Sequence, residues 1–201
     1  LMTTPGSREP AGEGALELGP AAVLMPVKSF RHAKQRLGLV LTDSERRALV
    51  REMAEHVLAA ARPLPVAVVC DDPEVADWAR RHHALVVWVP GRGLNGAVEA
   101  GVDRLASMGV KQVTVAHGDL PRARDIGGLP AFDGVTLVPD RQRDGTNVLR
   151  LPTNCGFRFS YGPGSFHRHV QECARIGLPS QVLDEPELAF DVDWPSDLAS
   201  T

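Results

Sequence analysis

A stretch of basic residues near the start of the chain is the first feature that could do chemistry. An apolar run ends at Pro26-Val27, and four cations follow within nine residues: Lys28, Arg31, Lys34 and Arg36. Like charges this close repel one another, so a loop of this kind favours an anionic ligand. If the apolar run is the first strand of an α/β sheet, the loop follows its carboxyl end, where such sheets bind ligands. The pattern predicts a triphosphate site, with a solvated surface loop as the alternative.

Three aspartates supply the opposite charge. Asp119 comes where the fourth expected strand ends, and Asp191 and Asp193 are two residues apart, so both leave an extended backbone from the same face. Mg²⁺ is usually held by one or two carboxylates plus substrate phosphates, so acids facing a cationic loop predict a magnesium–phosphate site. Taken singly, Asp119 or Asp193 fits a cap equally well, because an Asp near a Pro often caps a turn or a helix.

The segment Gly91-Arg92-Gly93-Leu94-Asn95-Gly96 spells a dinucleotide-binding pattern between an expected strand and an expected helix. In a dinucleotide fold this pattern follows the first strand, whereas here the first strand is followed by the cations. Asn95 is either an N-cap or a polar contact to a base or ribose. A nicotinamide-dependent oxidoreductase therefore stays open as an alternative function, and it predicts stabilisation by NAD(P)H without Mg²⁺.

Two glycine-rich turns carry hydroxyl side chains. They are Asp144-Gly145-Thr146-Asn147 and Tyr161-Gly162-Pro163-Gly164-Ser165-Phe166. The second leads into an expected helix, whose first N–H groups favour an anion. Ser165 lies outside the G-x-S-x-G pattern of a hydrolase nucleophile, so it is expected to cap the helix or to contact a ligand.

The elements that must position these side chains alternate along the first part of the chain. Short apolar runs predict strands at about 21–27, 66–70, 84–89 and 110–116. Helices are expected between them, the first opened by the capping box Thr42-Asp43-Ser44-Glu45 and the second by Asp72-Pro73. This alternation predicts a parallel sheet core. The second half predicts strands near 134–138, 146–151 and 181–183, a helix over 166–176, and either a strand or an extended arm at 157–161.

Composition bounds the class of protein. With 201 residues, 43% of them hydrophobic, the chain is long enough for one domain with a sizeable core. Residues 1–19 are expected to be a disordered leader, and residues 20–201 a single domain. The net charge of −3 argues against a nucleic-acid partner, because nucleic-acid-binding domains are usually strongly basic. No apolar run approaches the roughly 20 residues that span a bilayer, so no membrane partner is expected.

Neither a signal peptide nor a zinc site is expected. The start of the chain lacks a basic region followed by a long apolar core. The three cysteines, Cys70, Cys155 and Cys173, are odd in number and contain no CxxC pair, which favours reduced thiols and a cytoplasmic location.

Six blocks taken together resemble the phosphoenolpyruvate / 2-phospho-L-lactate guanylyltransferase family of coenzyme F-420 biosynthesis. In chain order they are Pro-Val-Lys…Ala-Lys-Gln-Arg-Leu, Gly-Leu-Asn-Gly-Ala, Gly-Asp-Leu-Pro, Asp-Gly-Thr-Asn-Val-Leu, Tyr-Gly-Pro-Gly-Ser-Phe-His-Arg-His and Asp-Val-Asp-Trp-Pro-Ser-Asp-Leu. They run from about residue 22 to 199. The chain departs from the family pattern at His117-Gly118 and at the basic-rich 140–143.

The resemblance implies a GT-A-like (Rossmann-like) nucleotidyltransferase fold, a three-layer α/β architecture with a mostly parallel mixed sheet, and dependence on Mg²⁺. The implied metal ligands are Asp119, Asp191 and Asp193. The residues implied to bind GTP are Lys28, Lys34 and Arg36 at the phosphates and Asn95 near the nucleoside. Lys28 and Asp119 are the implied catalytic pair, and the residues implied to hold the acceptor's carboxylate are Thr146, Gly162 and Ser165.

The implied reaction is attack of the acceptor's phosphate oxygen on the α-phosphorus of GTP, with release of pyrophosphate. The sequence does not separate phosphoenolpyruvate, 2-phospholactate and 3-phosphoglycerate as acceptors, and we take phosphoenolpyruvate as the first expectation. A molybdopterin or sugar-phosphate nucleotidyltransferase is a second reading, disfavoured because no Gly-Gly-x-x-x-Arg loop follows the first strand. A binding module that releases no pyrophosphate is a third. The oligomeric state is open, and a homodimer is compatible with the sequence.

Overall fold

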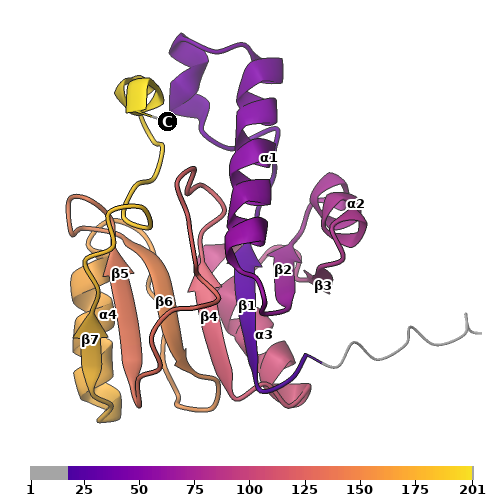
Figure 1. Ribbon diagram of the computed structural model, residues 1–201. Coiled ribbons are helices and arrows are strands. Elements are labelled where there is room, and N and C mark those ends of the chain that lie inside the picture. Colours follow the sequence, from indigo (N-terminus) through magenta and orange to yellow (C-terminus); the bar gives the residue numbers. More distant parts are fainter. Residues whose placement is uncertain (1–17, 201) are drawn as a thin grey trace, which may run out of the picture.

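Residues 18–200 are described by a computed structural model, shown in Figure 1 as a seven-stranded sheet with helices on both faces. The strands are β1 (Ala21–Pro26), β2 (Val66–Cys70), β3 (Leu85–Trp88), β4 (Gln112–Ala116), β5 (Val135–Pro139), β6 (Thr146–Pro152) and β7 (Ser180–Val182). The α-helices are α1 (Asp43–Ala60), α2 (Pro73–Arg81), α3 (Gly93–Ser107) and α4 (Ser165–Ile176). Two short 3-10 helices complete the set, η1 (Gln35–Leu39) and η2 (Pro195–Ser200).

The sheet has the order β3-β2-β1-β4-β6-β5-β7. β1 pairs in parallel with β2 and β4, β2 with β3, and β5 with β7, whereas β6 is antiparallel to both of its neighbours. Among these seven strands, β6 is therefore the one that runs against the rest. The predicted mostly parallel mixed sheet is confirmed.

Helices cover the two faces of the sheet and create two cores. β1 contributes side chains to both cores, because successive side chains of a strand point alternately to opposite faces of the sheet. Val23 and Met25 pack with α1 and α2 in one core, and Leu24 packs with α3 and α4 in the other. In Figure 1, α1 lies in front of the sheet, and α3 and α4 lie behind it. The result is the expected three-layer α/β architecture.

Local signals in the sequence set several helix boundaries. The Thr42 hydroxyl accepts from the Glu45 backbone N–H while the Glu45 carboxylate accepts from the Thr42 N–H, so the predicted capping box is confirmed. The Asp72 carboxylate accepts from the Glu74 N–H and opens α2. A glycine permits the close packing of α3 on β1, because a Cβ at Gly101 would lie 2.7 Å from a methyl carbon of Leu24.

Two segments go beyond the sequence-based predictions. For residues 157–161 the sequence left a strand or an extended arm open, and the structure has the arm, which pairs with none of the described strands and buries the side chains of Phe157, Phe159 and Tyr161 in the core that α3 and α4 share. The basic stretch contains η1, which the sequence did not predict. The residue just before η1 is Lys34, and it has a left-handed backbone conformation (φ 51°).

The expected leader falls mostly outside the part of the chain that the structure describes. Residues 1–17 are not covered, and Leu18 is buried in the α3–α4 core. None of the helices between residues 18 and 200 is long and apolar enough to cross a membrane.

Segments that are distant in sequence meet at one edge of the sheet. The loop after β1 and the residues after β4 both lie at the carboxyl ends of parallel strands, and β6 begins at the same edge. The C-terminal segment returns to this edge, where η2 contacts η1 at the top of Figure 1. The fold thus brings the predicted cations and acids into one region.

Candidate active site

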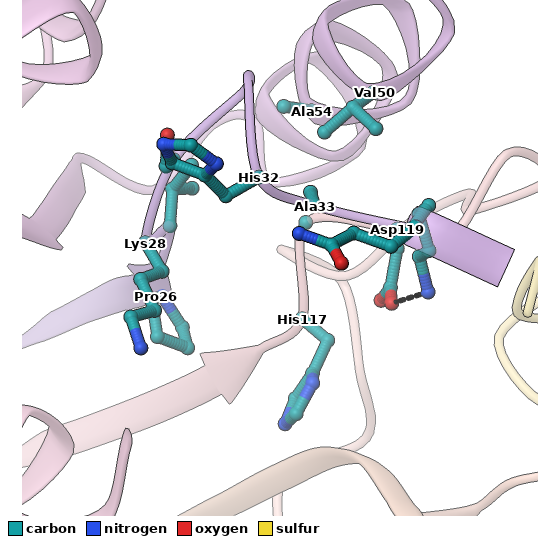
Figure 2. Close-up of a pocket in the computed structure, with 13 residues that line it drawn as sticks. Pro26, Lys28, His32, Ala33, Val50, Ala54, His117 and Asp119 are labelled. Carbon is teal, nitrogen blue, oxygen red and sulfur yellow. Dashed lines mark hydrogen bonds and ion pairs between the residues drawn. The ribbon is translucent and has the colours of Figure 1, made fainter. Parts of the chain in front are cut away.

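The loop after β1 covers a cavity of about 360 Å³, here called the loop cavity. Figure 2 shows exposed Lys28 on one side of this cavity and Asp119 on the other, with His117 below and Val50 and Ala54 of α1 above. Within residues 18–200 the Lys28 ammonium makes no ion pair, so its charge is available to a ligand.

Lys34 behaves differently from Lys28, although both lie on the same loop. Its Nζ donates to a carboxylate oxygen of Asp119 and, at 2.7 Å, to Oδ1 of Asp193. The Lys34 side chain is only 11% exposed, against 26% for Asp119 and 49% for Asp193. The ammonium therefore joins the loop to acids that come 85 and 159 residues later in the chain.

A buried arginine of α1 holds the loop in the conformation that aims Lys34 at the acids. The Arg46 guanidinium donates to the carbonyl of Arg31 at 2.8 Å and to that of Ala33, and it forms an ion pair with Asp43 at 2.8 Å. Arg46 is 6% exposed. A buried guanidinium needs such partners, because an unpaired charge in the interior is strongly unfavourable.

The acid pair after β7 is held by its own set of contacts. The Asp197 carboxylate accepts from the backbone N–H groups of Asp193 (3.0 Å) and Trp194 (2.8 Å). Arg141 donates to Asp197 at 2.8 Å and to the carbonyl of Asp191 at 3.3 Å. These bonds fix the backbone that carries Asp191 and Asp193.

The pKa values of the charged groups reflect how closely they are packed. Burial alone would lower the pKa of Lys34, but the charges of Asp119 and Asp193 outweigh burial and raise it. Burial would raise the pKa of Asp119, yet the Lys34 ammonium holds it below its usual range. For Asp191, burial and the charges of Asp119 and Asp193 raise the pKa to about 6. The single positive charge of Lys34 thus faces three carboxylates, so a further cation would stabilise this group of acids.

The three aspartates fit a divalent cation in their chemistry, and an ammonium stands between two of them. Carboxylate oxygens are the ligands that Mg²⁺ prefers, and Asp119 and Asp193 converge on the point that Lys34 Nζ occupies. Within residues 18–200, no three acidic, histidine or cysteine side chains lie close enough to coordinate one metal ion together. A metal ion bound by Asp119, Asp191 and Asp193 would therefore take the place of the ammonium.

A second cavity of about 430 Å³, here called the turn cavity, adjoins the loop cavity. It shares His117 and Asp119 with the loop cavity. Its other walls come from the two glycine-rich turns and the acid pair, including Thr146, Gly162, Ser165, Asp191 and Asp193. The exposed guanidinium of Arg36 lies over the ring of Trp194 at 4.5 Å from the centroid, on the rim of the turn cavity.

A buried histidine organises the hydroxyl groups of the turn cavity. His169 Nε2 accepts from the Ser160 N–H at 3.0 Å, so the neutral ring carries its proton on Nδ1 and donates to Thr146 Oγ1, also at 3.0 Å. The Thr146 N–H donates in turn to Ser165 Oγ at 3.1 Å. Both hydroxyl oxygens act as acceptors in these bonds, which leaves their protons for donation to a ligand.

Asn95 contacts the protein backbone. Its Oδ1 accepts from the Tyr161 N–H at 2.6 Å, and its Nδ2 donates to the Tyr161 carbonyl at 3.4 Å. Asn95 is not the N-cap of α3, which is Arg92. In the described part of the chain, the buried Tyr161 hydroxyl and the buried Nε2 of His117 lack a hydrogen-bond partner, and both side chains line the turn cavity.

A third, mostly apolar cavity lies between the ends of β1 and β2 and the start of α3, here called the helix cavity. Lys28 lines it together with Val69, Leu94 and Ala97. Asp71 adds a carboxylate that makes no hydrogen bond or ion pair within residues 18–200.

Comparison with known proteins assigns the family. A family model described as "Guanylyl transferase CofC like" matches residues 21–201. The chain belongs to this CofC-like guanylyltransferase family. A protein named phosphoenolpyruvate guanylyltransferase from Sphaerobacter thermophilus is 38% identical over 87% of this chain and 89% of its own length. The protein of the same name from Rubrobacter xylanophilus is 38% identical over 88% of this chain and 90% of its own.

Solved structures agree on the fold of this guanylyltransferase. A putative nucleotide-diphospho-sugar transferase from Desulfovibrio desulfuricans superposes with a TM-score of 0.72 at 17% identity, covering 89% of this chain and 84% of its own. A 4-diphosphocytidyl-2C-methyl-D-erythritol synthase from Anaerococcus prevotii gives 0.61 at 8% identity, covering 94% and 97%. The expected nucleotidyltransferase fold and the guanylyltransferase class are confirmed, and the family match decides against the nicotinamide alternative.

The structure brings most of the predicted site residues to the adjoining cavities. Lys28, Lys34 and Asp119 line the loop cavity. The turn cavity is lined by Arg36, Asp119, Thr146, Gly162, Ser165, Asp191 and Asp193. Asn95 lines neither of these two cavities, and its side-chain amide bonds to the backbone of Tyr161.

Sequence reasoning missed the residues that hold this site in place. Arg46 holds the backbone just before Lys34, and His169 and Arg141 contact site residues or their backbone, yet none of the three was predicted for this role. Two of them carried a signal, because His169 ends a block that resembles the family and Arg141 lies in the basic segment that departs from the family pattern.

Proposed function

We propose that this guanylyltransferase transfers GMP from GTP to phosphoenolpyruvate, releases pyrophosphate, and serves coenzyme F-420 biosynthesis. The observation that carries the proposal is the junction of the loop and turn cavities at Asp119. One cavity offers cations suited to a triphosphate, and the other offers hydroxyl donors suited to a small acid. The names of the relatives support phosphoenolpyruvate as that acid.

The triphosphate of GTP would lie along the loop after β1. The Lys28 ammonium, which makes no ion pair within residues 18–200, lies on the border of the loop and helix cavities. The helix cavity would take the base, because its walls are apolar and Asp71 offers a carboxylate acceptor. Guanine presents N–H donors at N1 and N2 that a carboxylate can accept, whereas adenine presents an acceptor at N1. Asp71 therefore favours guanine over adenine.

The acceptor would bind in the turn cavity. The hydroxyl protons of Thr146 and Ser165 are available to its carboxylate, since both oxygens already accept bonds from the protein. Gly162 has φ +118° and leaves room beside the same turn. Arg36, stacked on Trp194, supplies a positive charge at the rim.

The proposed transfer needs no strong general base. The acceptor's phosphate is largely ionised near pH 7, so it can attack the α-phosphorus of GTP directly. What remains is to align the two reactants and to neutralise the charge of the pyrophosphate that leaves. Bound Mg²⁺, held by Asp119, Asp191 and Asp193, would supply part of that neutralisation. Lys28 would supply another part from the opposite wall.

The test is to incubate the protein with GTP, Mg²⁺ and one acceptor at a time, then measure pyrophosphate and the mass of the product. We expect phosphoenolpyruvate to give pyrophosphate and a product in which GMP is joined to it by a diphosphate bond. Faster turnover of 2-phospholactate or 3-phosphoglycerate would overturn phosphoenolpyruvate as the acceptor. No pyrophosphate with any of the three would overturn the proposed guanylyl transfer to these acids. We further propose a cytoplasmic location, and light scattering would test whether the protein is a homodimer.

A further inference from the structure

The position of the Lys34 ammonium is the feature that the proposed reaction does not explain. A lysine that serves only to bind phosphate would be expected to face solvent, as Lys28 does. Lys34 instead bonds with both Asp119 and Asp193 and keeps 11% of its side chain exposed. Those two acids also belong to the set that would hold the metal ion.

The loop is built to place the ammonium there. Lys34 has φ 51° and ψ 44°, a left-handed conformation that only a few per cent of non-glycine residues adopt. Arg46 bonds to the carbonyls of Arg31 and Ala33, just before this residue, and η1 begins just after it. A backbone of this kind persists only where its surroundings hold it, so the placement of Lys34 is a property of the fold.

An ammonium and a divalent cation cannot share this position. Mg²⁺ coordinates carboxylate oxygen at about 2.1 Å, and the oxygens of Asp119 and Asp193 that converge on one point are the two that Lys34 Nζ already contacts. With the ammonium in place, Asp119, Asp191 and Asp193 form no three-residue group that could hold a metal ion within residues 18–200. A metal ion that bridges these two oxygens would therefore displace Lys34.

We propose that Lys34 is a built-in counter-cation, which holds the metal position between Asp119 and Asp193 until a divalent cation displaces it. The displaced ammonium is then available to an anionic ligand in the adjoining loop cavity. Two consequences follow: the nucleotide-free protein binds a divalent cation weakly, and the metal ion and a polyphosphate bind cooperatively. The identity of the polyphosphate rests on the proposed function, whereas the exchange of cations does not.

The first experiment measures Mn²⁺ binding to the nucleotide-free protein by electron paramagnetic resonance. Lys34→Met removes the competing charge and shortens the side chain by only one atom, so we expect its Mn²⁺ affinity to rise at least tenfold. Lys28→Met is the matched control, because it removes one positive charge from the same loop without touching the acids. We expect the control to change the affinity by less than threefold.

Equal affinities for the two folded variants would overturn the proposal, since the effect would then be one of general charge. A decrease for Lys34→Met would overturn it as well. Circular dichroism checks the fold of each variant, and Lys34→Gln replaces Lys34→Met if that variant does not fold.

A second experiment uses the unaltered protein. Trace acetylation followed by mass spectrometry measures how reactive Lys34 is relative to Lys28. We expect saturating Mn²⁺ to raise the reactivity of Lys34 several-fold as its ammonium leaves the carboxylates. Unchanged reactivity with Mn²⁺ bound would overturn the exchange. Neither experiment uses GTP or an acceptor, so their failure is distinct from a failure of the proposed reaction.

Discussion

The two walls of the candidate active site are held together by different kinds of interaction. On the loop side, a charged lysine and a charged arginine join distant parts of the chain, Lys34 to Asp119 and Asp193, and Arg46 to backbone carbonyls. On the turn side, neutral groups position the hydroxyl and amide groups, His169 at Thr146 and Asn95 at Tyr161, while the charged Arg168 supports the carbonyls of the second glycine-rich turn.

This difference in the kind of interaction suits the proposed role of each wall. Ion pairs can be exchanged for others, which suits our proposal that the loop wall trades Lys34 for a metal ion and offers cations to a polyphosphate. Neutral hydrogen bonds between buried groups are directional, so the turn wall fixes two hydroxyl donors before any ligand arrives. One wall is therefore adaptable and the other preorganised.

The largest effect is expected at Asp119, which belongs to both cavities. Asp119→Asn keeps the shape of the side chain but removes the charge that faces Lys34 and the expected metal ion. We expect kcat/KM to fall by about three orders of magnitude or more, equivalent to roughly 4 kcal/mol of transition-state stabilisation. Pyrophosphate release measures this, with circular dichroism as the check of the fold. Activity within tenfold of the parent would remove Asp119 from the catalytic machinery.

Arg46→Met tests the charged anchor of the loop wall. The variant loses two bonds to the carbonyls of Arg31 and Ala33, and the backbone on one side of Lys34 is freed. We expect the free energy of unfolding to fall by about 3 kcal/mol and the KM for GTP to rise, while the KM for the acceptor stays close to that of the parent. Urea denaturation and initial rates measure the two effects. A change in the acceptor KM alone would contradict the separation of the walls.

A pair of variants at His169 tests the neutral anchor of the turn wall. His169→Asn can still donate to Thr146, and His169→Gln can still accept from Ser160. We expect the Gln variant to raise the acceptor KM about 30-fold, because the Thr146 hydroxyl loses its donor, and the Asn variant to stay within about threefold. The KM for GTP serves as the internal control. Equal acceptor KM values for both variants would show that His169 only supports the fold.

The same histidine predicts how stability depends on pH. Burial, and then the charge of Arg168, lower the pKa of His169 from 6.5 to about 4. Because the unfolded chain binds this proton first as the pH falls, the contribution to stability is complete above pH 6.5 and is lost progressively toward pH 4. Between pH 7 and pH 5 the parent should lose about 2 kcal/mol more than His169→Gln, measured by urea denaturation. Identical losses would mean that His169 is protonated normally in the fold.

The smallest effect is expected at Asp71 in the helix cavity. Asp71→Asn replaces an acceptor-only carboxylate with an amide that can also donate, so the preference for guanine should weaken. We expect the ratio of kcat/KM for GTP to that for ATP to fall about tenfold. Competition between the two nucleotides in one reaction measures the ratio directly. An unchanged ratio would place the base elsewhere in the cleft.

The sequence predicted the features that depend on neighbouring residues. The capping box at Thr42, the cap at Asp72 and the strand–helix alternation are local, and each is confirmed. The basic loop and the three acids could also be recognised in the sequence, because their charges limit which ligands they can bind. The alternating arm at 157–161 was ambiguous, since its aromatic side chains are buried without any strand pairing.

What the sequence could not provide are the contacts between distant residues. Lys34 and Asp193 are 159 positions apart, and nothing local marks Lys34 as the lysine that meets the acids. The same holds for His169 and Thr146, which are 23 positions apart, and for Asn95 and Tyr161, which are 66 apart. The last two pairs depend on the register of the sheet and on the packing of α3 and α4.

The most direct test of the central claim follows two radioactive phosphorus atoms of GTP. With phosphoenolpyruvate and Mg²⁺ present, label at the α-phosphorus should pass to the acceptor, and label at the γ-phosphorus should leave as pyrophosphate. Transfer of the γ-label to the acceptor, or α-label that stays in GTP, would contradict guanylyl transfer across this cleft.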